Sequence, residues 1–87
     1  MNHNKNFTDL KMKQRERIQE WLYAETLCFY RDNNHMPNKL DRDIILKSVC
    51  IKIENADIWI PFGEVKKYYL SHLIHFEKRV LREIGRE

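Results

Sequence analysis

Four side chains have the types and order of a metal-dependent nuclease site. Asp57 is followed by Glu64 and Lys66, an order in which two carboxylates hold Mg²⁺ and a lysine stabilises the attacked phosphate. Glu25, on an upstream helical segment, could supply a further acid. Such sites place their two parts on adjacent strands, whereas here a segment with Pro and Gly separates them and Glu64 suits a helix start. We therefore rank a nuclease third among the functions considered.

The last amphipathic segment, residues 63–84, has a predominantly basic side. Its apolar residues recur at helical spacing, and Lys and Arg occupy the opposite flank. Such side chains neutralise phosphates, and a neighbouring aromatic ring adds stacking. Surface helices also carry Lys and Arg as ordinary solvated charge, and Glu77 and Glu83 dilute this flank. Our leading hypothesis is a non-enzymatic binding or regulatory protein that contacts nucleic acid, DNA rather than RNA, through this flank. Its residues are Lys67, Tyr68, His75, Lys78, Arg79 and Arg82.

A second basic cluster lies in the first half of the N-terminal helical segment. Its members are Lys11, Lys13, Arg15 and Arg17. The core-facing positions of this half are polar, so we expect it to extend beyond the core, where it can contact solvent, a polyanion or a second subunit. We therefore treat these four residues as secondary nucleic-acid contacts and expect a homodimer formed through this helix.

Aromatic residues are more numerous than a small helical core requires. The surplus suggests a surface covered within the monomer, by a dimer mate or by a partner protein, since Tyr and Trp are favoured at interfaces. Its expected residues are Trp21, Tyr23, Leu27, Tyr30 and Trp59. The alternative function is thus a protein-binding adaptor or inhibitor. The abundance of Ile, Asn, Lys and Tyr fits an AT-rich genome, such as that of a low-GC bacterium, its phage or a mobile element.

We expect no metal and no cofactor. His72 and His75 are three residues apart, but zinc needs three or four ligands, and no Cys or third His has a fixed spacing to this pair. Cys28 and Cys50 lie in apolar contexts, which is typical of small buried residues in a reducing compartment. Residues 1–17 lack the apolar core of a signal peptide, and no apolar run approaches the ~20 residues of a membrane span. A cytoplasmic protein without a membrane association is the expectation.

The elements that position these residues follow from composition and periodicity. The chain has 87 residues, 33% of them charged, a net charge of +3 and only two Gly and two Pro, which favours helices. We predict a mainly α domain of three helices over residues 8–87, after a flexible segment 1–7. Long helices span about 8–32 and 63–84, with a shorter one over 41–54. Because residues 47–62 also alternate at period two, an α+β fold with a β-hairpin there is the alternative.

Overall fold

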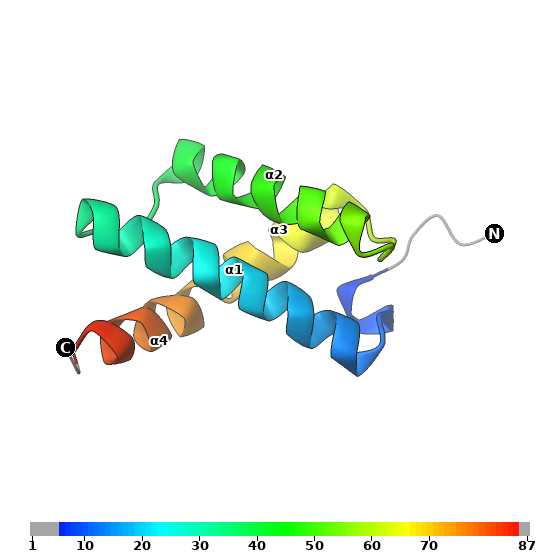
Figure 1. The fold of residues 1–87 in the computed structure, drawn as a ribbon, viewed down its shortest axis with the longest axis horizontal. Coiled ribbons are helices and arrows are strands. Elements are labelled where there is room, and N and C mark those ends of the chain that lie inside the picture. The colour runs from blue at the N-terminus through cyan, green and yellow to red at the C-terminus, as the bar shows by residue number, and fades with distance from the viewer. Residues whose placement is uncertain (1–5, 86–87) are drawn as a thin grey trace.

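The computed structural model describes residues 6–85 as a short 3₁₀ turn followed by four α-helices (Figure 1). In chain order these are η1 (Phe7–Asp9), α1 (Met12–Asn33), α2 (Lys39–Asn55), α3 (Phe62–Ser71) and α4 (Leu73–Gly85). No β-strand occurs between residues 6 and 85. The mainly α fold is therefore confirmed, and the alternative with a hairpin over 47–62 is wrong.

The capping of α2 explains why the helix forms where a hairpin was the alternative. The Asn38 side chain accepts a hydrogen bond from the Asp41 N–H at 2.9 Å, and the Asp41 carboxylate accepts one from the Asn38 N–H at 3.3 Å. This reciprocal pair satisfies two amides that a helix start leaves without partners. Four apolar residues at helical spacing are buried on one side of this helix. In a strand, odd-numbered and even-numbered positions face opposite ways, so these four could not all point to the core. They are Ile45, Leu46, Val49 and Ile53.

The start of the chain differs from the sequence-based expectation. The first helix begins at Met12, because residues 7–9 form a separate turn closed by a hydrogen bond from the Asn6 N–H to Asp9 at 3.0 Å. Phe7, which we had assigned to a flexible terminus, is only 6% exposed and packs into the core. Residues 1–5 of that expected terminus, and residues 86–87 of the expected helical domain, lie outside the described residues.

The expected C-terminal helix is divided in two at His72, whose φ of −114° and ψ of 14° depart from helical values. Side chains compete for the carbonyl oxygen of Tyr68 at this point: Ser71 Oγ donates to it at 3.0 Å, and His72 Nδ1 lies 2.9 Å from it. Such local hydrogen bonds perturb the helical ladder. Lys67 and Tyr68 therefore lie on α3, whereas the remaining residues of the predicted basic flank lie on α4.

The four helices enclose one core to which each of them contributes. α1 and α2 run antiparallel, α3 crosses behind them, and α4 returns beside α1 (Figure 1). Ile18 and Leu22 of α1, Val65 of α3 and Val80 of α4 are all fully buried. Of the two cysteines, Cys50 is half-buried but Cys28 is exposed, which corrects the prediction that both are buried. No helix within residues 6–85 is long and apolar enough to cross a membrane.

Within residues 6–85, ion pairs join three pairs of neighbouring helices. Lys52 of α2 contacts Glu25 of α1 at 3.2 Å, and Lys66 of α3 contacts Asp43 of α2 at 3.5 Å. The third pair is bidentate: the Arg79 guanidinium of α4 donates to both carboxylate oxygens of Glu20 on α1, at 2.8 and 2.9 Å. Exposed pairs contribute little to stability, so their main effect here is to fix which side of each helix faces its neighbour.

Candidate nucleic-acid interface

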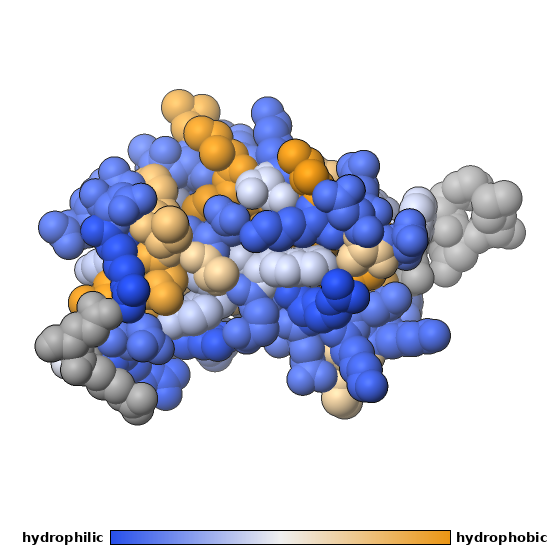
Figure 2. Space-filling model, viewed as in Figure 1, coloured by the Kyte–Doolittle hydropathy of each residue, from blue (hydrophilic) through white to orange (hydrophobic). Residues whose placement is uncertain are grey.

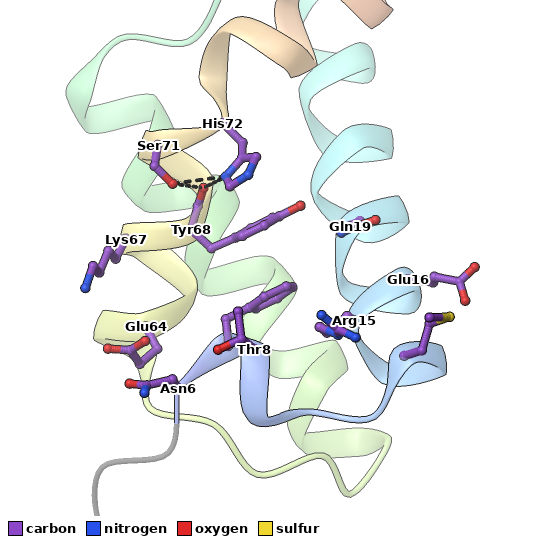
Figure 3. A pocket seen from close by; sticks show the side chains of 12 residues that line it. Asn6, Thr8, Arg15, Glu16, Gln19, Glu64, Lys67, Tyr68, Ser71 and His72 are labelled. Carbon is purple, nitrogen blue, oxygen red and sulfur yellow. Dashed lines mark hydrogen bonds between the residues drawn. The ribbon is translucent and has the colours of Figure 1, made fainter.

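A groove of about 670 Å³ lies between η1 and the first turns of α1 on one side and α3 on the other (Figure 3). Three of the side chains predicted to contact nucleic acid line it: Arg15 from α1, and Lys67 and Tyr68 from α3. Their sequence separation exceeds 50 residues, so the fold brings together the secondary and the primary basic clusters. A cavity of this size falls in the range of ordinary ligand sites.

Aromatic rings form a series that we call the ring stack: Phe7, Tyr68 and His72 line the groove, and His75 follows outside it. The Phe7 and Tyr68 rings are 4.0 Å apart and inclined by 13°, and the Tyr68 and His72 rings are 4.2 Å apart and inclined by 27°. His75 continues the series at 5.7 Å from His72 with a tilt of 39°. The first two pairs are closer than the usual ~4.5–7 Å between ring centroids, and the third lies within that range. Exposure rises along the stack, from buried Phe7 through half-buried Tyr68 and His72 to exposed His75.

Tyr68 connects the ring stack to α1. Its hydroxyl extends across the groove toward Gln19, and Arg15 points at the same space from the next turn of α1 (Figure 3). Burial raises the pKa of the Tyr68 hydroxyl, while a hydrogen bond with Gln19 and the charge of Arg15 act in the opposite direction. Tyr68 therefore stays neutral at physiological pH and can donate a hydrogen bond.

The positive charges at the groove are not neutralised by close partners. Lys67 is exposed, and within residues 6–85 no carboxylate lies at ion-pair distance from it. The Nε of Arg15 is buried and has no hydrogen-bond partner in the described part of the chain. Glu16 and Glu64 also line the groove, so its walls offer hydrogen-bond acceptors as well as donors. A ligand that carries both negative charge and hydrogen-bonding groups would match this lining.

His72 has a defined tautomer in this arrangement. Because a carbonyl oxygen only accepts, the contact between His72 Nδ1 and the Tyr68 carbonyl requires the proton on Nδ1. The Ser71 hydroxyl lies 3.0 Å from the same nitrogen. The neutral ring then presents an unprotonated Nε2 as its remaining hydrogen-bonding atom.

Three of the predicted contacts on α4 remain open to solvent, and we call them the basic face of α4: His75, Lys78 and Arg82. They are spaced by three and four residues and so share one side of the helix. No carboxylate of residues 6–85 forms an ion pair with Lys78 or Arg82. Arg79 differs, because its guanidinium is held by Glu20 and lies 3.7 Å above the ring centroid of Tyr23. The hydrogen bond with Glu20 raises the pKa of Arg79 and lowers that of Glu20.

The remaining residues of the N-terminal cluster do not line the groove. Lys11, Lys13 and Arg17 are exposed, and Arg17 lies 5.1 Å above the ring of Trp21, at cation–π distance. Lys11 is the residue directly before Met12, which begins α1 and does line the groove. Arg15 is therefore the member of this cluster that the fold joins to Lys67 and Tyr68.

The four candidate nuclease residues are distributed over three parts of the molecule. Glu25 is half-buried on α1, Asp57 is exposed in the turn after α2, and Glu64 and Lys66 lie in α3 and not on a strand. Two of them have other partners: Lys66 contacts Asp43, and Glu25 contacts Lys52 as well as the Ser48 hydroxyl at 3.4 Å. Across the described chain, no group of three or more His, Cys, Asp or Glu side chains is placed to hold a metal ion.

The predicted protein interface is largely covered within the monomer. Tyr23 is only 8% exposed beneath Arg79, and Trp21, Leu27 and Tyr30 are partly buried against the core. Trp59 remains open, with 55% of its surface exposed. Of these side chains, Tyr23 is thus covered by Arg79 of α4.

Sequence reasoning missed a different exposed surface, the outer face of α2: Leu40, Ile44 and Ile51. These residues are 74%, 66% and 60% exposed, and hydrophobic atoms are visible over α2 in the upper part of Figure 2. Their spacing of four and seven residues places them on one side of the helix, opposite the buried stripe. That spacing was a detectable signal, but we had attributed the apolar residues of this segment to the core alone.

Comparisons with protein-family models, with curated proteins and with solved structures found no match to this chain. The fold and the groove therefore define it as a small mainly α protein with an aromatic and cationic groove.

Proposed function

We propose that the protein binds nucleic acid through the groove and the adjacent basic face of α4. The observation that carries this proposal is the convergence of Arg15, Lys67 and Tyr68 on one groove from two distant segments. Aromatic rings beside unpaired Lys and Arg side chains are the combination that binds nucleic acid through bases and phosphates. Lys78 and Arg82 extend the positive surface along α4.

The charge of the whole chain supports only a modest affinity. With a net charge of +3, the protein has no general attraction for polyanions that would hide the contribution of a local site. Binding should therefore depend on a few cations. Each phosphate contact to a single strand contributes about 0.7 to the slope of log K against log salt concentration, and to a duplex about 0.9.

Fluorescence anisotropy at several salt concentrations tests the proposal, with labelled duplex DNA and single-stranded RNA. We expect binding that weakens as salt rises, and a lower affinity and a shallower slope for Lys67→Glu and for the double variant Lys78→Glu/Arg82→Glu. Lys47→Glu is the matched control for Lys67→Glu, because Lys47 is equally an exposed helical lysine but lies outside the groove. No binding at low salt, or an equal loss for Lys47→Glu, would overturn the proposal.

A second candidate function is the binding of a partner protein through the outer face of α2 and Trp59. Large exposed apolar side chains in one row favour such contacts over solvent. The two candidates differ in salt dependence, since an apolar contact persists at about 1 M salt, where the Debye length is only about 3 Å. Sedimentation measures this association. If it persists at high salt and is lost in the double variant Ile44→Lys/Ile51→Lys, the result would support this candidate instead. Unchanged sedimentation of that variant would count against it.

A further inference from the structure

We propose that the groove and the adjoining start of α4 bind single-stranded nucleic acid, with an unpaired base stacked on the exposed imidazole ring of His75. This inference rests on the proposed function and specifies its ligand. The ring stack is closed at one end, because Phe7 is buried in the core, and open at the other, because His75 is exposed. A planar ligand can therefore extend the stack only at its histidine end.

The geometry of the ring stack favours an unpaired base over a duplex. Tyr68 and His72 already have a ring neighbour on each side, so a ligand that extends the series must lay an isolated flat group on His75. Bases in a duplex are paired and stacked on each other, and reach such a site only after unstacking. Bases of a single strand are free to stack on aromatic side chains, and this is the usual mode of sequence-tolerant recognition.

The hydrogen-bonding groups of the groove fit the edge of a base. Glu16 and Glu64 accept, and the Gln19 amide has further donor and acceptor capacity beside its hydrogen bond with Tyr68. A base edge carries donors and acceptors together, unlike an inorganic anion or a fatty chain. The acidic side chains, which weaken a purely electrostatic site, thus have a use as acceptors for exocyclic amino groups.

Cations occur both in the groove and on α4 beyond His75. Arg15 and Lys67 lie at the groove, and the basic face of α4 continues beyond His75. From His75 to Arg82 the helix rises by about 10 Å, the length of a few nucleotides of an extended strand. A single strand could therefore cross the ring stack with its phosphates near Lys67 on one side and near Lys78 and Arg82 on the other.

Anisotropy with one 15-mer sequence, as single-stranded DNA, as single-stranded RNA and as duplex DNA, tests this inference. We expect at least tenfold tighter binding of a single strand than of the duplex. His75→Ala should weaken single-strand binding by about 5- to 150-fold, the loss of one stacked base. His35→Ala is the matched control, because His35 is also exposed but lies in the turn between α1 and α2.

Photo-crosslinking supplies a second measurement that needs no substitution. An oligonucleotide with 5-iodouracil should crosslink to the tryptic peptide covering residues 68–78, which contains three of the four rings of the stack. The stacked base would be refuted by three results together: equal affinity for duplex and single strands, no effect of His75→Ala, and crosslinks in other peptides. Such results would leave the proposal of salt-dependent nucleic-acid binding intact. Absence of binding to all three oligonucleotides would instead refute the proposed function and this inference with it.

Discussion

The buried hydrogen bonds between α1 and α3 lead to a prediction whose sign depends on which partner is removed. The Tyr69 hydroxyl lies 2.6 Å from Thr26 Oγ1, which lies 2.7 Å from the Leu22 carbonyl oxygen, and Thr26 and Tyr69 are both 0% exposed. A carbonyl only accepts, so Thr26 donates its one hydroxyl proton to Leu22. Tyr69 must therefore be the donor in its bond to Thr26.

This direction determines the cost of each substitution. In Tyr69→Phe the Thr26 hydroxyl keeps its bond to Leu22, so the loss is that of an ordinary hydrogen bond, about 1 kcal/mol. In Thr26→Val a side chain of similar shape leaves the Tyr69 hydroxyl buried without an acceptor, which costs about 2 kcal/mol, within a range of 1–3. The double variant removes both polar groups and should lose only about 1 kcal/mol. Tyr69→Phe is thus expected to stabilise a protein that already carries Thr26→Val.

Urea unfolding followed by circular dichroism at 222 nm measures the three variants as a double-mutant cycle. For a domain of this size, each 1 kcal/mol corresponds to a shift of about 4–8 °C in Tm, so thermal unfolding is an independent check. Thr26→Ser, which retains the hydroxyl, serves as the control. Additive losses in the double variant, or a Thr26→Val protein as stable as Tyr69→Phe, would show that the assigned direction of the bond is wrong.

Three further predictions concern pH and backbone conformation. The hydrogen bond from Arg79 lowers the pKa of Glu20 below its ordinary value of 4.5. The stability that this ion pair contributes should therefore be present above pH 4.5 and be lost as the pH falls through the lowered pKa. In urea unfolding between pH 3 and 7, Glu20→Gln should lose less stability at acid pH than the unsubstituted protein. Burial raises the pKa of Tyr69 above 10.0, so the unfolded chain ionises first and stability should fall above pH 10, less steeply in Tyr69→Phe. Asn34 ends α1 with φ 61°, a left-handed conformation, so Asn34→Ala should cost about 1 kcal/mol while Asn34→Gly should be neutral or stabilising in thermal unfolding.

The sequence was most informative where apolar residues recur at helical spacing. For α2, this spacing predicted a helix over 41–54 against the competing period-two pattern of 47–62, and the structure has Lys39–Asn55. The break at His72 could not be predicted in this way, because it depends on side-chain hydrogen bonds to the Tyr68 carbonyl, and His and Ser are ordinary residues in a helix. Phe7 was missed because its burial depends on a ring contact with Tyr68, sixty-one positions later.

For the candidate site, the sequence indicated which residue types could bind a ligand but not which of them lie close together. Charge and aromaticity identified Lys67 and Tyr68, and periodicity placed them on one helix. Their proximity to Arg15 is a consequence of how α3 packs near η1 and α1, which periodicity does not encode. The exposed outer face of α2 was overlooked although its spacing of four and seven residues was detectable, because the apolar residues outside the core stripe were not considered as a second face.

Arg79 shows why a basic side chain on a helix surface does not by itself identify a phosphate contact. Its fork to Glu20 is geometrically well matched, and the ring of Tyr23 lies directly beneath the guanidinium. A phosphate would have to share the Arg79 guanidinium with this carboxylate, whereas Lys78 and Arg82 on the same helix have no such partner among residues 6–85. Arg79 therefore attaches α4 to α1, and in doing so it fixes the direction in which the basic face of α4 points. The charge available to a ligand is set by the residues that the fold leaves unpaired, and on α4, among residues 6–85, those residues are Lys78 and Arg82.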